Sequence, residues 1–123
     1  MKQIHVDFQK YKEMRYPTLG DYAEFNNCIR FFIATTDDKG KKIKEKEQFL
    51  TLIHEMVEAY LCFFQGVEWK EIDKYDIDMD KKNPDIEPGD QEDAPYHKQH
   101  EIAKQIEKFL ASELGVNWEE YNG

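Results

Sequence analysis

Three residues in the segment FLTLIHEMVEAYLC, Phe49–Cys62, have the types and spacing needed to hold and use a metal ion. His54 and Glu58 are four residues apart, so on a helix their side chains share one face and can reach the same ion. Glu55 lies about 100° further round the helix, where its carboxylate can point at a water molecule on that ion. In zinc hydrolases with the H-E-x-x-H pattern, the glutamate is the general base. Glu58 replaces the second histidine of that pattern, and its oxygen is also a competent zinc ligand.

An ordinary solvated helix face could hold the same three residues. From Glu45 to Gln65 the only Lys or Arg is Lys46, although the chain contains 17. Solvated faces usually mix both charge signs, with Glu–Lys pairs at four-residue spacing. Leu50 and Leu61 flank the polar arc, which indicates that another part of the protein partly covers it. These observations favour a metal site and leave the solvated face as the alternative.

A third ligand is expected from the segment PYHKQHEIAKQIEKF, because a catalytic zinc site has three protein ligands and one open position. His100 lies beside the apolar arc of this second helix, whereas His97 is turned about 60° further toward solvent. We therefore favour His100 and keep His97 as the alternative. Glu107 could orient His100 through its other ring nitrogen, but we interpret it as a surface glutamate. Two histidines and a carboxylate suit zinc, and they also suit ferrous iron.

The elements that would position these residues can be read from periodicity. Alternation of apolar and polar residues over Ile4–Phe8 predicts a strand, and a turn follows around Pro17 and Gly20. The β-branched and aromatic segment Cys28–Thr36 predicts a second strand, which ends at the turn signal Asp37-Asp38-Lys39-Gly40.

Two helices are predicted in the rest of the chain. The first runs from about Ile43 to Gln65 and the second from about Ala94 to Leu114, with Asp93 as its N-cap. Residues 73–93 between them are acidic and contain prolines, which is typical of a loop. We expect the helices to bury their apolar arcs: Phe49, Leu52, Ile53, Met56, Val57, Tyr60, Phe63 and Phe64 in the first, and Ile102, Ala103, Ile106, Phe109, Leu110 and Leu114 in the second. The sequence thus predicts a small α+β fold.

Charge and composition exclude several classes of function. The chain of 123 residues has 26 acidic and 17 basic residues, a formal net charge of -9, which would repel nucleic-acid backbones and anionic membranes. Cys28 and Cys62 are too few for a disulfide framework. No stretch is apolar enough for a signal peptide or a membrane span. We expect a cytoplasmic protein with one domain over residues 1–123, binding neither nucleic acid nor membrane.

On these residues the chain resembles the minimal zincin metallopeptidases, in which a strand, an HExxE or HExxH helix and a later helix build the site. It is most similar to small bacterial and phage proteins with a helix of the IHEMVEA type and a later PYHxxH segment. The resemblance implies that Cys28–Thr36 is an edge strand that binds an extended peptide, and that Glu55 is the base. It also implies three zinc ligands, which are His54, Glu58 and His100.

Three functions fit these observations. The leading hypothesis is a zinc metallohydrolase acting on a peptide or amide bond of a peptide or protein substrate, with Glu55 as general base. The second is a non-enzymatic interaction module with a structural metal or none. The third is a magnesium-dependent nucleotide pyrophosphohydrolase that uses Glu55 and Glu58. The acidic segment Asp76–Glu87 has the spacing of a calcium-binding EF-hand loop, but Lys81 replaces the required glycine, which favours a solvated loop.

Overall fold

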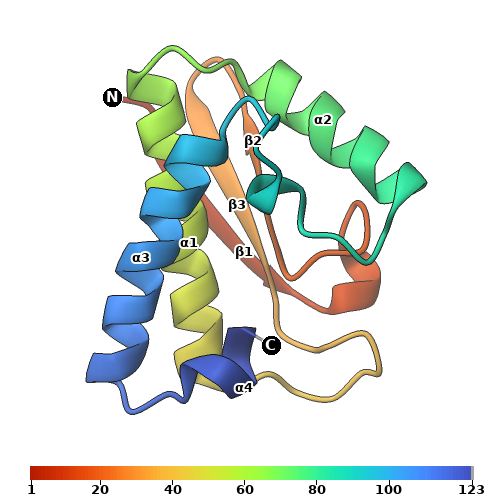
Figure 1. Ribbon diagram of the computed structural model, residues 1–123, viewed down its shortest axis with the longest axis vertical. Helices are drawn as coiled ribbons and strands as arrows, with labels where there is room; N and C mark the ends of the chain where they lie inside the picture. The colour runs from red at the N-terminus through yellow and green to blue at the C-terminus, as the bar shows by residue number, and fades with distance from the viewer. Residues whose placement is uncertain (123) are drawn as a thin grey trace.

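The fold combines a small sheet with two long helices packed side by side (Figure 1). The computed structural model describes residues 1–122, and it has the α+β architecture that the sequence predicts. The strands are β1 (Gln3–Gln9), β2 (Gly20–Glu24) and β3 (Cys28–Ala34). The α-helices are α1 (Glu45–Phe64), α2 (Trp69–Lys82), α3 (His97–Glu113) and α4 (Trp118–Asn122), and single 3₁₀ turns occur at Tyr11–Glu13 and Pro88–Asp90.

The sheet has the order β1-β3-β2, with β1 parallel and β2 antiparallel to β3. The predicted strand Cys28–Thr36 is therefore central, and the expectation that it is an edge strand is wrong. Strand β2, which the sequence analysis left as a turn around Pro17 and Gly20, forms the edge beside α1. The alternation of apolar and polar residues that predicts a strand is interrupted in β2, because the polar residue Asp21 is buried. The Arg15 guanidinium pairs with the Asp21 carboxylate at 2.8 Å, which offsets the cost of burying that charge.

Helix α1 packs against both the sheet and α3. The predicted orientation of both helices is wrong in part, because Phe64 and Phe109 are each 66% exposed while Glu58 and His100 are buried. On α3 the alanines Ala103 and Ala111 are completely buried. The core beneath consists of Tyr22, Ile29, Phe31, Ala59, Cys62, Ile72, Ala94 and Tyr96.

The acidic region 73–93, predicted as a loop, is helical over residues 73–82, which form the C-terminal part of α2. This helix buries only Ile72 completely, so its apolar signal is weak, and Asp73 fixes it to Arg15 at 2.8 Å. The helix includes Asp76–Lys82, so that segment does not have the extended form of a calcium loop. Helix α3 begins at His97 after Tyr96 as N-cap. Asp93 is not the cap; its carboxylate accepts a hydrogen bond from Tyr75 instead.

No helix within residues 1–122 is long and apolar enough to cross a membrane.

Candidate metal centre

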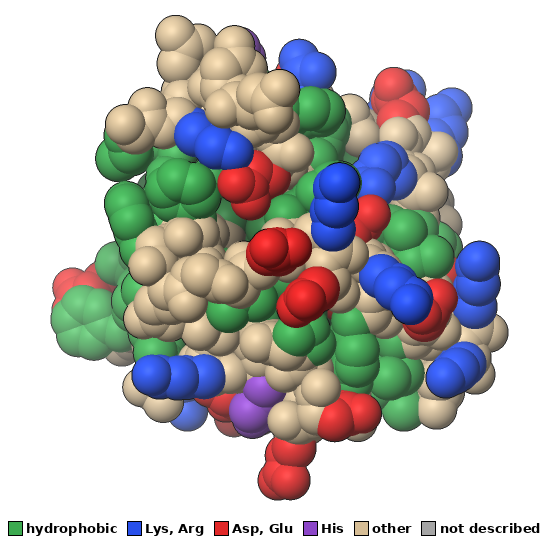
Figure 2. Space-filling view, turned by 90° about the horizontal axis from the view of Figure 1, so that it is seen from above, with side chains coloured by type: hydrophobic (Ala, Val, Ile, Leu, Met, Phe, Trp, Pro, Cys, Tyr) green, Lys and Arg blue, Asp and Glu red, His purple; other side chains and the backbone are tan. Residues whose placement is uncertain are grey.

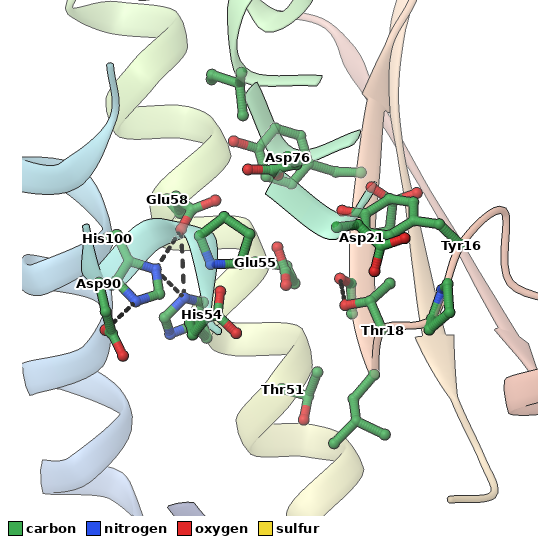
Figure 3. A pocket seen from close by; sticks show the side chains of 18 of the residues that line it. Tyr16, Thr18, Asp21, Thr51, His54, Glu55, Glu58, Asp76, Asp90 and His100 are labelled. Atoms are coloured by element: carbon green, nitrogen blue, oxygen red, sulfur yellow. Dashed lines mark hydrogen bonds and ion pairs between the residues drawn. The ribbon is translucent and has the colours of Figure 1, made fainter. Parts of the chain in front are cut away.

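Three potential ligand atoms from α1 and α3 converge on one point (Figure 3). His54 Nε2 lies 3.2 Å from His100 Nδ1, and Glu58 Oε1 lies 2.9 Å from His100 Nδ1 and 3.4 Å from His54 Nε2. Tetrahedral zinc with bonds of about 2.0–2.1 Å separates its ligand atoms by about 3.3–3.4 Å. The three atoms are thus spaced much as the corners of one face of such a tetrahedron. They belong to the three residues that the sequence analysis favoured as ligands.

In each imidazole, the ring nitrogen that faces away from the shared point is hydrogen-bonded to a carboxylate. Glu107 Oε1 accepts the hydrogen bond of His54 Nδ1–H at 2.8 Å, and Asp90 Oδ1 accepts that of His100 Nε2–H at 3.0 Å. With those nitrogens protonated, the opposite nitrogens present their lone pairs toward the shared point. The interpretation of Glu107 as a surface residue is wrong, since it is 8% exposed, and the ring that it orients is His54 and not His100.

These two carboxylates have further partners that fix them. The Tyr121 hydroxyl, on α4, donates to Glu107 Oε2 at 2.5 Å, and it lies 3.2 Å from the Thr51 hydroxyl on α1. The Lys104 ammonium donates to Asp90 at 3.1 Å. The short helix α4 therefore contributes to the site through Tyr121. The sequence analysis missed this residue because no local spacing connects it with the HExxE segment.

The 3₁₀ turn Pro88–Asp90 forms a wall against His100. A Cβ atom added to Gly89 would lie 2.3 Å from His100 Nδ1 and 2.4 Å from Cγ, so only glycine permits this approach. His97 Nδ1–H donates to the Gly89 carbonyl at 2.9 Å. His97 therefore supports the turn and lies outside the group of ligand atoms. The sequence signal for this wall was the Glu-Pro-Gly-Asp turn at 87–90, which the analysis assigned to a loop.

The electrostatics of the group favour positive charge at its centre. Burial tends to lower the pKa of His54, but hydrogen bonds to Glu107 and Glu58 outweigh it and raise that pKa to about 11. At His100, burial tends to lower the pKa, but the hydrogen bond to Glu58 and the charge of Glu58 outweigh it, so the pKa is raised. For Glu58, burial is outweighed by His100 and His54, and its pKa is lowered. Either protonated imidazoles or a cation can meet this demand for positive charge.

Glu55 lies next to the group but is not tied into it. Figure 3 shows its carboxylate between the imidazole pair and the side of the cavity formed by Asp21 and Tyr16. None of the residues described here acts as a hydrogen-bond partner for it. Burial, together with the charge of Glu58, raises its pKa well above the ordinary value. Strand β2 approaches it closely, since a Cβ at Gly20 would lie 2.6 Å from Glu55 Oε1.

The group opens into a cavity of about 470 Å³ between α1, β2, α2 and the 87–90 turn. Ten carboxylate side chains and a single lysine line it. In contrast, acidic and basic side chains are interspersed on the outer face seen in Figure 2. Asp76 is one of the lining carboxylates and accepts a hydrogen bond from Tyr96. Burial, together with the negative charges of Glu58 and Glu87, raises the pKa of Asp76 to about 8.

Comparison of the chain with protein-family models, with curated proteins and with solved structures gave no significant match.

Proposed function

We propose that this protein is a zinc-dependent hydrolase of peptide or amide bonds, with His54, Glu58 and His100 as the zinc ligands. The observation that carries the proposal is the convergence of three ligand atoms whose two imidazoles are each oriented by a buried or ion-paired carboxylate. Metal-bound histidines almost always donate their other ring N–H to a carboxylate, a backbone carbonyl or a water molecule, and here both imidazoles donate to a carboxylate. Ligand type alone also fits ferrous iron.

Glu55 is the residue that we propose moves the proton. Zinc, when bound, would polarise the scissile carbonyl and acidify a water molecule. The Glu55 carboxylate, with its raised pKa and without a hydrogen-bond partner among residues 1–122, is suited to take the proton of that water. It would then give the proton to the leaving nitrogen, so that water adds across the amide bond and an amine and a carboxylate are released.

The lining of the cavity supports a cationic substrate. Ten carboxylates around one lysine attract basic groups and repel anionic ones. The negative charge of the lining would repel the phosphates of a nucleotide. Magnesium prefers oxygen ligands to the two imidazole nitrogens found here. Both features disfavour the magnesium-dependent nucleotide hydrolase.

The edge of β2 beside the site has limited room for an added strand. The Trp69 indole N–H donates to the Tyr22 carbonyl at 2.8 Å, and the Thr18 hydroxyl donates to the Gly20 carbonyl at 2.9 Å. A peptide that pairs with β2 as an extended strand would have to replace these bonds. We therefore favour a substrate that enters the cavity with a short segment, such as a basic side chain next to the scissile bond.

The test begins with metal content by plasma mass spectrometry on untagged protein. We expect one zinc per chain in the wild type, none in His54→Ala or His100→Ala, and unchanged zinc in His5→Ala, a control at an exposed histidine. Peptides with and without Lys or Arg would then be screened for cleavage. Glu55→Gln should keep the metal and lose turnover.

Two results would contradict the proposal. If zinc does not bind even after refolding in its presence, the non-enzymatic interaction module becomes the better interpretation. If Glu55→Gln cleaves a confirmed substrate at the wild-type rate, Glu55 is not the base.

A further inference from the structure

Strand β1 has a free edge. The Gln3 N–H donates to the Asn27 carbonyl at 3.0 Å, and the Gln9 carbonyl accepts from the Thr35 N–H at 2.8 Å. Because backbone groups alternate along a strand, the odd-numbered residues of β1 face β3. The N–H and carbonyl groups of Ile4, Val6 and Phe8 therefore point outward, and within residues 1–122 no neighbouring strand pairs with them.

The side chains of this edge do not protect it from pairing. Natural edge strands usually carry a proline, an inward charge or a bulge that prevents pairing with another chain. β1 pairs with β3 without a break in register over Gln3–Gln9 and contains no proline. Ile4 and Phe8, on the helix-facing side, are 42% and 53% exposed. An exposed edge of this kind is a docking surface for another strand.

The sequence of β1 indicates which strand would fit. QIHVDFQ reads almost the same in both directions by residue class. When two copies lie antiparallel with Val6 opposite Val6, the remaining residues form matched pairs: Ile4 with Phe8, His5 with Asp7, and Gln3 with Gln9. Apolar cross-strand pairs stabilise an antiparallel ladder, and an imidazole N–H of His5 can donate a hydrogen bond to the Asp7 carboxylate of the other copy.

Only this register gives complementary pairs. A shift of one residue would bring an outward residue opposite an inward one, so the backbone bonds could not form. Centring on Asp7 would place two carboxylates opposite each other, and like charges in that position destabilise the ladder. Centring on His5 would pair His5 with His5 and Asp7 with Gln3, so no imidazole would lie opposite a carboxylate.

We propose that two copies of this chain associate through antiparallel pairing of their β1 strands, centred on Val6, to form one six-stranded sheet. The outward groups of Ile4, Val6 and Phe8 in both copies would form about six backbone hydrogen bonds. The contact is isologous, as is usual in homodimers. Lys2 falls opposite Lys10 at each end, but Lys2 is already ion-paired with Glu24 at 2.7 Å.

The metal centre does not take part in this contact. The axis of symmetry lies between the two β1 strands, whereas the cavity adjoins β2 at the opposite edge of the sheet. The helices of both copies would lie on the same side of the joined sheet. The dimer is therefore independent of the proposed hydrolase activity, and either can hold without the other.

Sedimentation equilibrium from low micromolar to near-millimolar concentration tests the proposal. The wild type should form a dimer. His5→Asp should raise the dimer Kd about tenfold, because each pair of an imidazole N–H donor with the Asp7 carboxylate becomes a pair of carboxylates. Asp7→His, which places two imidazoles opposite each other, should weaken the dimer in the same direction. The double swap, His5→Asp with Asp7→His, restores both pairs and should recover most of the wild-type Kd. Gln105→Glu, which adds one negative charge on exposed α3, should change nothing.

Amide hydrogen exchange distinguishes a lost contact from a misfolded strand. In the wild type, the Ile4, Val6 and Phe8 amides should become protected as concentration rises, while the Gln3, His5 and Asp7 amides are protected throughout. A wild-type chain that stays monomeric at near-millimolar concentration overturns the proposal. So does a dimer whose Kd is the same in His5→Asp, because such a dimer uses another surface.

Discussion

Replacing Gly89 by alanine should abolish tight metal binding without altering any proposed ligand. A Cβ at this position would lie 2.3 Å from His100 Nδ1, whereas real Cβ atoms essentially never approach closer than 3.0 Å. The imidazole or the turn must therefore move by at least about 0.7 Å. Zinc–ligand distances tolerate only about 0.2 Å. The turn also carries Asp90, which holds the other nitrogen of His100, so a shift in the turn would release that ring as well.

The size of the effect can be estimated from what is lost. Mutating the partner that orients a metal-bound histidine costs about 10–100-fold in affinity, and displacement of the ring itself should reach at least the upper value. At a zinc concentration of about 100 times the wild-type Kd, zinc would stabilise the wild type by about 2.7 kcal/mol. The variant would gain only about 0.4 kcal/mol. For a domain of this size, the zinc-dependent rise in Tm should fall from roughly 10 °C to one or two degrees.

The assay is zinc titration against a chromophoric chelator, together with thermal unfolding in zinc and in EDTA. Gly40→Ala is the matched control. Its φ of 81° makes alanine strained, but nothing lies within 4 Å of the added Cβ, so it should lose stability and keep zinc affinity. If Gly89→Ala binds zinc as tightly as the wild type, His100 is not a ligand in the geometry described here.

Three further changes test other parts of the site. Glu107→Gln should weaken zinc binding about tenfold, because the amide oxygen can still accept the hydrogen bond from His54 but carries no charge. The control in the same titration is Glu113→Gln, at an exposed position of the same helix. In EDTA, the free energy of unfolding should fall as the pH rises from about 4 to about 8. The pKa of native Asp76 is raised to about 8, so in this range the native protein holds a proton that the unfolded chain releases. Asp76→Asn should remove that contribution, as measured by urea unfolding across this range. Ala103→Leu, at a fully buried position of α3, should cost about 1–3 kcal/mol by overpacking, whereas an unchanged urea midpoint would contradict tight packing there.

The part of the site that lies on one helix was predictable from the sequence. The spacing of His54 and Glu58 determines that they share a face of α1, whatever packs against it. His100 was favoured over His97 because of its angular position on α3, and the structure brings His100 next to the pair. Both inferences needed only helical geometry. The α+β fold was also predictable from the order of apolar patterns along the chain.

The remaining features depend on contacts between distant segments. β2 was missed because Asp21 is buried by its pairing with Arg15, and α2 was missed because it buries only Ile72 completely. The Glu-Pro-Gly-Asp sequence at 87–90 signals a turn, but no local signal shows that the chain returns over His100 and packs Gly89 against it. The expectation that apolar arcs face inward failed for the same reason. A helix can bury its polar arc when other segments supply the partners, which the isolated helix sequence does not reveal.

Charge balance explains how α1 can bury such an arc. Glu58, Glu107 and Asp90 place three negative charges around His54 and His100, and Lys104 supplies one positive charge. Two further positive charges are needed for neutrality, and burying the group without them would cost several kcal/mol. A divalent cation supplies both at the point where the three ligand atoms meet, and leaves the imidazoles neutral. Two protonated imidazoles supply the same charge, so the fold can form before metal binds. The site is therefore an integral part of the α1–α3 interface, and changes to its outer carboxylates should alter metal affinity more than they alter the fold.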